Sequence, residues 1–447
     1  MEKRTFIKLT SAAMASPLLA PIEKWMPDDK LKNWAGNLEY STNKISYPKS
    51  IEEARKLIAS NDRLKILGTR HCFNRIADSK DYFVSLRDMN KVVKLDAEAK
   101  TVTVEGGMKY GELCPLLDSK GFALHNLASL PHISVAGACT TATHGSGVRN
   151  GNLSTGVSAL EFITADGQII QLTKKDDGEK FKAAVVGLGA IGAITKVTLD
   201  ILPTYSVRQY VYENLPFSQL KTHFDEILSA AYSVSLFTDW QADTVNEVWI
   251  KAIESDKTDF SSTKEFYGAK AATKNMHPIA TLSAENCTEQ MGVAGPWFER
   301  LPHFKMGFTP SSGVELQAEY FVPRKYGLEA FLAISKLGKE IGPHLFISEI
   351  RTIDADEFWM SPCYNEPCTT IHFTWKQDWP AVSKLLPKVE AALAPFDARP
   401  HWGKLFTIAP SVLRGKYEKL DAFKKLVASY DPKGKFRNEF LKKNLYD

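Results

Sequence analysis

A histidine stands in a glycine-led turn near the start of the chain. The turn spans Gly68–Phe73 (GTRHCF) and follows a short apolar run, residues 64–67, that is typical of a buried strand. Such a turn directs successive backbone N–H groups outward, and a group of donors of this kind suits a phosphate. In that setting His71 lies beside the anion. Taken alone, the turn is equally compatible with an ordinary turn histidine.

Two stretches late in the chain place polar side chains where strands are expected. In residues 347–351 the period of two puts Glu349 and Arg351 on one face, and in residues 371–375 it puts His372 and Thr374 together. Acids, bases and hydroxyls therefore occupy a face that is usually apolar. Both salt-bridged surface strands and a substrate-binding face fit this pattern.

Residues 127–147 (LASLPHISVAGACTTATHGSG) are dense in small side chains and hydroxyls. A stretch with so few large side chains can wrap a large ligand and offer N–H and O–H donors to its phosphates. A solvated surface loop is the alternative. A loop in water normally carries more charge, and only His132 and His144 add basic groups here, which favours the ligand cradle.

Residues 187–192 (GLGAIG) match the GxGxxG dinucleotide fingerprint, a weak signal by itself. In a Rossmann fold this motif opens a helix. Here it precedes an apolar, β-rich run, residues 193–202, so the Rossmann interpretation fails. The glycines instead predict a backbone that passes close to a flat ligand or a neighbouring strand.

Short strands and helices alternate over the first half of the chain. Ser50 precedes two glutamates and predicts a helix that ends near residue 60. Asp166-Gly167 predicts a β-hairpin turn. After Pro203 the helices are longer and strands are expected at 315–321, 345–352 and 370–375. We therefore expect a domain boundary near residue 205.

The chain has 447 residues, which suits two domains, and its composition is that of an ordinary soluble protein. The net charge of +4 is spread along the sequence, which argues against a nucleic-acid partner. The six cysteines form no CxxC pair. Cys363 and Cys368 are close enough for half of a zinc site or a disulfide, but no second pair completes a metal set, so free thiols are favoured.

Residues 1–28 are predicted to be an export leader. Lys3-Arg4 and a short apolar run of small residues, Leu9–Ala20, resemble a twin-arginine leader in which lysine replaces the first arginine. This predicts an exported or periplasmic protein. The run is too short to span a bilayer, so no stable membrane insertion is expected. A retained amphipathic helix, and with it a cytoplasmic location, is the alternative.

Four segments, in this order, resemble the PCMH-type FAD-binding domain of the vanillyl-alcohol oxidase type of flavoprotein. They are residues 68–73, 102–124, 127–147 and 187–195. Within that type the chain is most similar to alditol oxidases, with sugar-lactone oxidases as the next relatives. The resemblance extends over roughly residues 45–447. It implies an α+β fold, with two small α/β subdomains that cradle FAD and a substrate domain whose antiparallel sheet is flanked by helices.

The resemblance also implies boundaries and roles. Residues 40–205 would bind FAD, residues 206–422 would bind substrate, and residues 423–447 would pack back on the FAD domain. His71 would be bonded covalently to the flavin 8α-methyl group. The residues implied to bind FAD are Gly68, Thr69, Arg70, His71, Cys72, Ser129, Ser134, Gly137, Ala138, Cys139, Thr140, His144 and Ile194. The motif around Cys139 also resembles the site of a second flavin link in some relatives, and a buried small thiol is the favoured role.

The activity implied is oxidation of the terminal CH₂OH of a polyol such as xylitol or sorbitol to the aldose. Hydride would pass to FAD, and oxygen would be reduced to hydrogen peroxide. Arg351 and Lys404 would hold the developing alkoxide, with Lys404 as a proton acceptor. The residues implied at this site are Arg351, Lys404, Glu349, Ser129, Thr374 and His372.

Other interpretations stay open at this point. A sugar-lactone oxidase, or a dehydrogenase with another electron acceptor, would use the same scaffold. An exported carbohydrate-binding protein without flavin would be colourless. A reductase of the cell-wall precursor type would need a nicotinamide donor, and the sequence shows no second dinucleotide site.

Overall fold

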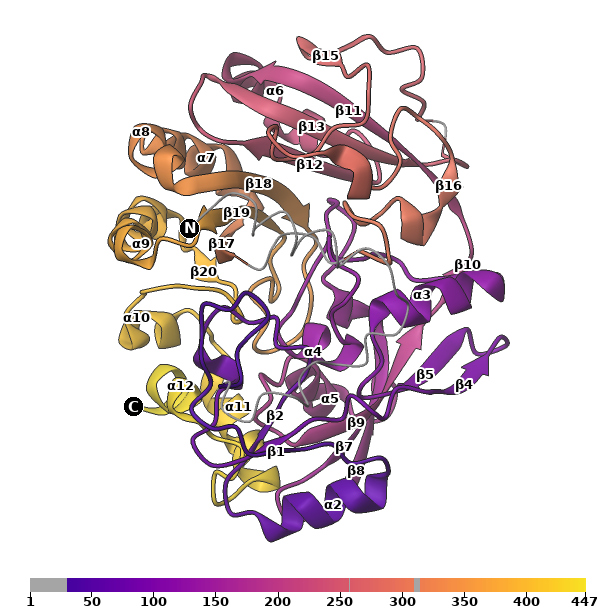
Figure 1. Cartoon of the computed structure of the whole chain (residues 1–447), viewed down its shortest axis with the longest axis vertical. Coiled ribbons are helices and arrows are strands. Elements are labelled where there is room, and N and C mark those ends of the chain that lie inside the picture. The colour runs from indigo at the N-terminus through magenta and orange to yellow at the C-terminus, as the bar shows by residue number, and fades with distance from the viewer. Residues whose placement is uncertain (1–29, 257, 309–313) are drawn as a thin grey trace, which may run out of the picture.

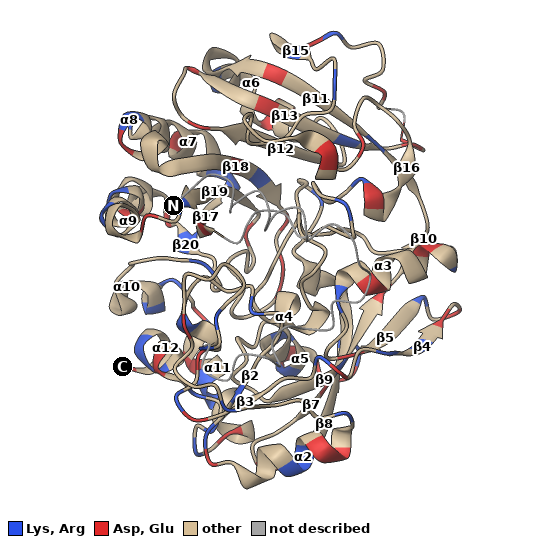
Figure 2. Cartoon of the chain, in the orientation of Figure 1, with Lys and Arg blue, Asp and Glu red and all other residues tan. Residues whose placement is uncertain are grey.

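The structure is a computed structural model that describes residues 30–256, 258–308 and 314–447. The predicted leader, residues 1–28, lies outside the described residues. In the described ranges no helix has both the length and the apolar character needed to cross a membrane. Basic and acidic residues are interspersed over both halves of the molecule (Figure 2), in agreement with the spread of charge along the sequence.

The first domain contains two sheets, drawn in indigo to magenta in the lower half of Figure 1. One is parallel with the order β1-β3-β2, and the other is antiparallel with the order β4-β5-β9-β7-β8. Their strands are β1 (Ile45–Ser46), β2 (Lys65–Ile66), β3 (Phe83–Val84), β4 (Val92–Asp96), β5 (Thr101–Glu105), β7 (Val157–Ile163), β8 (Ile169–Thr173) and β9 (Ala193–Asp200). A separate pair joins β6 (Phe122–Ala123) to β10 (Leu202–Pro203). The helices of this domain are α2 (Ile51–Ser60), η2 (Arg75–Ala77), α3 (Tyr110–Ser119), α4 (Val135–Thr140), η3 (Leu153–Gly156) and α5 (Gly178–Val185).

Local sequence signals explain several of these elements. The Ser50 side chain accepts a hydrogen bond from the Glu53 N–H and caps α2, as predicted. The predicted Asp-Gly hairpin joins β7 to β8, with Gly167 at φ +84°. Gly192 has φ +151° immediately before β9, and a Cβ there would lie 2.4 Å from the carbonyl oxygen of Ile163. The glycines of the GxGxxG match therefore let the backbone approach a neighbouring strand, as expected.

The second domain is built on one large sheet, which we call the large sheet. Its order is β14-β15-β11-β13-β12-β18-β19-β17-β20, and β16 also pairs with β11. The strands are β11 (Ser206–Pro216), β12 (Ser233–Thr238), β13 (Thr244–Ile253), β14 (Glu265–Phe266), β15 (Ala269–Ala271), β16 (Gly295–Pro296), β17 (Glu315–Pro323), β18 (Leu345–Ile353), β19 (Cys368–Lys376) and β20 (Arg399–Pro400). The helical segments are α6 (Phe217–Leu228), η4 (Ala284–Asn286), η5 (Trp297–Glu299), η6 (Arg324–Tyr326), α7 (Gly327–Ser335), α8 (Gly338–Ile341), η7 (Gly342–His344), α9 (Trp379–Leu393) and η8 (Ala394–Phe396).

The two faces of the large sheet differ in chemistry. On one face, alternate residues pack in a single apolar core with α6, α7 and α9. The strand residues in this core include Val234, Leu236, Val248, Ile250, Leu316, Ala318, Tyr320, Ile350, Ile371 and Phe373. The intervening residues point to the opposite face, where β17, β18 and β19 carry charged and polar side chains. This period-two pattern confirms the predicted α+β class, with an antiparallel sheet flanked by helices.

The C-terminal part of the chain returns to the first domain. It contains α10 (Pro410–Gly415), α11 (Leu420–Tyr430), α12 (Glu439–Leu441) and η9 (Lys442–Tyr446). The Leu64 N–H donates to the carbonyl of Lys435, and the Asn438 amide donates to three carbonyls of the segment Arg75–Asp78. Leu413, Leu420 and Phe423 lie in the apolar cluster that also holds the core of the first domain.

Glu247 on β13 is a buried acid held by a single side-chain donor. Its carboxylate accepts a hydrogen bond from the indole N–H of Trp249 at 2.6 Å, and burial raises its pKa from 4.5 to about 7. Because the folded state then binds a proton more tightly than the unfolded chain, the free energy of unfolding falls as pH rises from 4.5 to about 7. The loss amounts to about 3 kcal/mol.

Glu247→Gln is expected to remove this pH dependence. Denaturant unfolding at pH 5 and pH 8 should show the variant gaining stability over the original protein at pH 8, and much less at pH 5. Glu340→Gln, at an exposed ion pair with Lys388, is the matched control. An equal stability difference at both pH values would contradict the role of Glu247.

Candidate active site and cofactor cleft

Two adjoining cavities together extend from the first domain to the polar face of the large sheet. The first has a volume of about 330 Å³ and lies within the first domain, and the second, of about 280 Å³, reaches the large sheet. They form one continuous cleft because nine residues line both: Ile66, Leu67, Gly68, Thr69, Arg70, Ser134, Gly137, Thr140 and Gly189.

The predicted phosphate turn is held from behind by hydrogen bonds. The Phe73 N–H donates to the carbonyl of Gly403 at 2.8 Å, and the Asn33 amide donates to the carbonyl of Cys72 at 2.9 Å. The amide of Asn37 donates to the carbonyl of Phe73 at 3.2 Å. Across residues 30–256, 258–308 and 314–447, no protein group accepts the backbone N–H of Gly68, Thr69, His71 or Cys72. Four donors thus remain for a ligand in the cleft.

His71 lies among aromatic rings at the junction of the two domains. Its Nδ1 is 3.3 Å from Nε2 of His132, and the ring of Trp34 lies over it with centroids 4.5 Å apart. Burial, reinforced by His132 and Lys404, holds the pKa of His71 well below its usual range. The imidazole is therefore neutral at physiological pH and keeps a lone pair. Sequence reasoning missed Trp34, which no local pattern marks.

Most residues predicted to bind FAD line the cleft. Ile194 lines the first cavity, and His144 and Ala138 line the second. Cys139 lines neither, because its thiol lies 3.7 Å from the hydroxyl of Tyr110 inside the core of the first domain. Those that line at least one cavity are Gly68, Thr69, Arg70, His71, Cys72, Ser129, Ser134, Gly137, Ala138, Thr140, His144 and Ile194. The position of Cys139 fits the buried-thiol role and gives no support to a second flavin link.

The polar face of the large sheet supplies the other wall of the cleft. Strand register places Glu349 on β18 opposite His372 on β19, and His372 opposite Glu319 on β17. Arg351 is two residues along β18, and Lys404 follows β20. All six residues predicted at the substrate site line the second cavity: Ser129, Glu349, Arg351, His372, Thr374 and Lys404.

Glu319 is the centre of this cluster. One carboxylate oxygen accepts a hydrogen bond from Arg351 Nη2 at 2.6 Å, and the other accepts one from Lys404 Nζ at 2.6 Å. His144 Nε2 lies 3.2 Å from the first oxygen, and Lys404 Nζ also lies 2.9 Å from His372 Nδ1. Glu319 is 1% exposed, so the cluster is shielded from water.

Burial and mutual charge set the protonation states of the cluster. Burial alone would raise the pKa of Glu319, but Lys404, His144 and Arg351 outweigh it and hold this pKa well below its usual range. Burial lowers the pKa of Lys404, and Arg351 lowers it further, while Glu319 opposes both. Glu319 is therefore ionised, and Lys404 loses its proton more readily than an exposed lysine does.

Sequence reasoning missed Glu319, although a signal was present. In residues 315–321 the polar side chains Glu315, Gln317 and Glu319 alternate with Leu316, Ala318 and Tyr320. The period-two argument that selected Glu349 and Arg351 applies equally to this strand. The structure adds what the sequence cannot supply, namely that Glu319 lies opposite His372 and is bonded to the two predicted cations.

The cleft has the features that FAD requires. Free amides at the Gly68–Cys72 turn suit a pyrophosphate, and glycines let the ligand approach the backbone. A Cβ at Gly137 would lie 2.7 Å from Ser134 Oγ, so the wall there is already close-packed without a side chain. No group of three or more metal-binding side chains gathers anywhere in the described part of the chain.

Family models agree with this arrangement. Residues 43–173 match the model for an FAD-binding domain, and residues 311–444 match the model for D-arabinono-1,4-lactone oxidase. The fold is similar to that of a solvent-stable cholesterol oxidase, with a TM-score of 0.75 over 93% of this chain and 97% of that one, at 15% identity. Fold and cleft together define a FAD-dependent oxidoreductase with a PCMH-type FAD-binding domain.

Sequence comparison narrows the family. The chain is 42% identical to alditol oxidase of Streptomyces sp. (strain IKD472 / FERM P-14339) over 92% of its own length and 97% of that protein. It is 27% identical to L-gulonolactone oxidase of Bos taurus over 93% of its length and 98% of the relative. The chain belongs to the alditol oxidase family. The prediction of a FAD-dependent oxidoreductase that acts on CH–OH groups is thereby confirmed.

Proposed function

We propose that this enzyme oxidises the terminal CH₂OH of a polyol such as xylitol or sorbitol to the aldehyde of the aldose, with oxygen reduced to hydrogen peroxide. The observation that carries the proposal is the buried cluster at the end of the cleft, where Arg351 and Lys404 share the Glu319 carboxylate. Similarity to an alditol oxidase at 42% identity supports the same substrate class.

Arg351 and Lys404 provide the groups that bind the reacting hydroxyl. Within the described ranges Arg351 Nε has no hydrogen-bond partner, although it lies 3.6 Å from a carboxylate oxygen of Glu349, and the residue lines the cavity. This buried donor is available to an incoming oxygen. Two cations next to that oxygen stabilise the negative charge that develops when its proton leaves.

Lys404 accepts the hydroxyl proton in this proposal. Its pKa is lowered by burial and by Arg351, so a larger fraction of the side chain is neutral at physiological pH than for an exposed lysine. Bound FAD supplies the acceptor for the hydride from the same carbon. Glu349, Thr374 and Ser129 line the same cavity and bind neighbouring hydroxyls, which fixes the chain of the polyol in register.

We also propose that a ring nitrogen of His71 is bonded to the 8α-methyl carbon of FAD. The two hydrogens that this bond replaces pass to oxygen, the acceptor the enzyme already uses. The low pKa of His71 supports this role because a neutral imidazole is the nucleophilic form. The free amides of the Gly68–Cys72 turn hold the pyrophosphate beside it.

The tether is tested by acid precipitation. Protein with His71 intact is expected to give a yellow pellet, and His71→Ala is expected to release its FAD into the supernatant. Cys139→Ser is the matched control and should keep the yellow pellet, since the Cys139 thiol faces the protein core. Retention of colour in the His71→Ala pellet would contradict the assignment.

The substrate class is tested by anaerobic mixing. The purified protein is mixed with xylitol, sorbitol or L-gulono-1,4-lactone while flavin absorbance is followed, and air is then admitted. Rapid bleaching by a polyol, followed by recovery of colour and formation of hydrogen peroxide, is the expected result. If the flavin colour returned only after an artificial electron acceptor was added, and not in air, the enzyme would be a dehydrogenase and oxygen would not be its acceptor.

Lactone oxidation is the second candidate. It is favoured by the match of residues 311–444 to the D-arabinono-1,4-lactone oxidase model, because this segment contains Glu319, Glu349, Arg351, His372 and Lys404. A sugar lactone also presents a CH–OH group to the same cations. Faster bleaching by the lactone than by either polyol would favour this function.

A further inference from the structure

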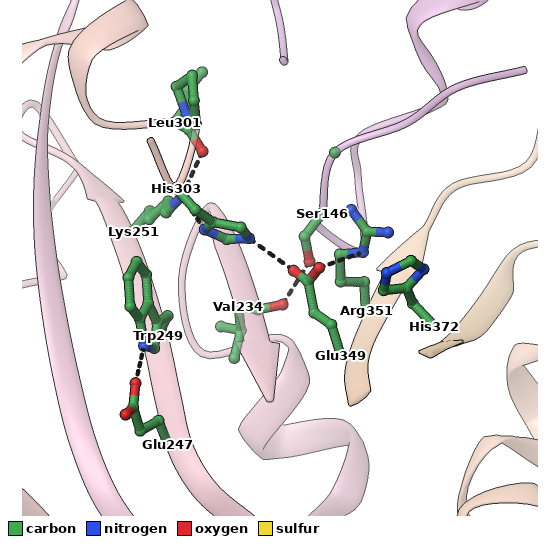
Figure 3. Close-up of polar contacts among 12 residues, drawn as sticks. Ser146, Val234, Glu247, Trp249, Lys251, Leu301, His303, Glu349, Arg351 and His372 are labelled. Atoms are coloured by element: carbon green, nitrogen blue, oxygen red, sulfur yellow. Dashed lines mark hydrogen bonds and ion pairs between the residues drawn. The ribbon is translucent and has the colours of Figure 1, made fainter. Parts of the chain in front are cut away.

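The Glu349 carboxylate is held on the side away from Glu319. Nε2 of His303 lies 2.8 Å from one of its oxygens, and Arg351 Nε lies 3.6 Å from the other. Figure 3 shows His303 reaching Glu349 from one side and Arg351 from the other. Glu349 is 5% exposed and ionised, because Arg351 and His303 outweigh the effect of burial and lower its pKa.

His303 is itself fixed by a second partner. Its Nδ1 lies 3.2 Å from Nζ of Lys251, which also donates a hydrogen bond to the carbonyl oxygen of Leu301. Lys251 stands on β13, two strands away from β18 in the large sheet. The imidazole is packed edge-on against Phe237 and Trp249, with ring centroids 5.3 and 5.2 Å away. The ring therefore cannot turn without disturbing two buried aromatic side chains.

The chemistry of this chain sets the tautomer of His303. The Glu349 carboxylate offers only acceptors, so the ring proton of His303 resides on Nε2. That proton points at the Glu349 carboxylate. Nδ1 then accepts from Lys251, whose Nζ carries donor hydrogens in both its charged and its neutral form, although burial lowers its pKa to about 7. Burial, reinforced by Lys251, lowers the pKa of His303 to about 4, so the ring is neutral at physiological pH and has one proton to place.

We propose that Lys251 and His303 are positioning residues of the active site. Lys251 fixes the proton of His303 on Nε2, and His303 then holds one oxygen of Glu349 so that the other accepts a substrate hydroxyl. The proposal rests on the proposed function, in which Glu349 binds the substrate. It adds two residues that act through Glu349, namely His303, which lines the second cavity, and Lys251, which does not.

The competing interpretation is that the contact between His303 and Glu349 is purely structural and does not affect substrate binding. The positioning role and the structural role predict different results for two substitutions of His303. Glutamine at 303 places its amide nitrogen near the original Nε2 and keeps a donor for Glu349. Asparagine is shorter and places its polar group near the original Nδ1, so it keeps a partner for Lys251 and leaves Glu349 without a donor.

The experiment measures kcat, KM and flavin absorbance for the FAD-loaded protein and its variants with xylitol. His303→Asn is expected to raise KM roughly tenfold, the effect of losing one charge-assisted hydrogen bond, with a smaller change in kcat. His303→Gln is expected to restore KM to near the original value. Lys251→Met should raise KM in the original protein and leave it unchanged in the His303→Asn background, because Lys251 acts through His303.

Two controls separate the possible failures. Melting temperature and flavin content show whether each variant folds. If the His303→Asn variant does not fold, comparing the KM values of His303→Gln and Lys251→Met still tests whether this pair affects substrate binding. Equal KM values for the asparagine and glutamine variants, in an enzyme that oxidises xylitol, would overturn only the positioning role. If neither xylitol nor the lactone reduced the flavin of the original protein, both the proposed function and this inference would be wrong.

Discussion

Lys404→Met lowers the turnover number for a polyol by roughly 10²–10⁴-fold, the usual contribution of a positioned proton acceptor. Methionine keeps much of the volume of the lysine side chain but neither accepts a proton nor carries charge. The Lys404 ammonium is bonded to Glu319 and His372 and to no backbone N–H of the Gly68–Cys72 turn, since it is itself a donor. FAD content is therefore expected to stay near that of the original protein, so the loss falls on the chemical step.

The measurement is anaerobic flavin reduction by saturating xylitol, followed by steady-state turnover in air. Lys388→Met, at an exposed ion pair on the same domain, is the control for loss of a lysine charge. It should leave both rates unchanged. Full turnover in Lys404→Met would mean that another group accepts the proton, and the assignment of Lys404 would be wrong.

Glu319→Gln has the second large expected effect. The substitution leaves Arg351 and Lys404 without their shared counterion in a buried site, and breaking a buried ion pair costs about 3–5 kcal/mol. It also removes the one charge in the cluster that raises the pKa of Lys404 most strongly. Lys404 must be neutral to accept a proton, so turnover rises with pH through its pKa. That rising limb is expected to move to lower pH in the variant.

Denaturant unfolding and the pH profile of kcat test the two parts separately. Glu340→Gln, which removes an exposed carboxylate of the same domain, serves as the control for both. A rising limb that stays in place or moves to higher pH would contradict Lys404 as the proton acceptor. Unchanged stability would show that Glu319 is not needed as a counterion.

Local patterns predicted much of the cofactor half of the cleft. The glycine-led turn with His71 and the small-residue stretch 127–147 both line the cavities. Their function depends on backbone donors and on the absence of large side chains, and both properties can be seen in consecutive residues. The failure of GLGAIG as a Rossmann motif was visible for the same reason, since the residues that follow it form a strand.

The substrate half could be predicted only in part. Period two identified Glu349 and Arg351, but the importance of Glu319 depends on which strands are neighbours in the sheet. Along the chain β17 and β18 are separated by the helical segments η6, α7, α8 and η7, and in the sheet β19 lies between them. The aromatic contact of Trp34 with His71 joins residues from different segments in the same way. The sequence shows that Cys139 stands in a glycine-rich motif. Only the structure shows that α4 directs its thiol into the core.

The return of the chain to the first domain has a consequence for synthesis. Lys65, at the base of the Gly68–Cys72 turn, donates a hydrogen bond to the carbonyl of Phe436, 371 positions later. A growing chain on the ribosome therefore lacks the support of its cofactor turn until almost all of these residues have been made. We therefore expect the turn to reach its full rigidity, and to capture the cofactor, only after Phe436 has been made.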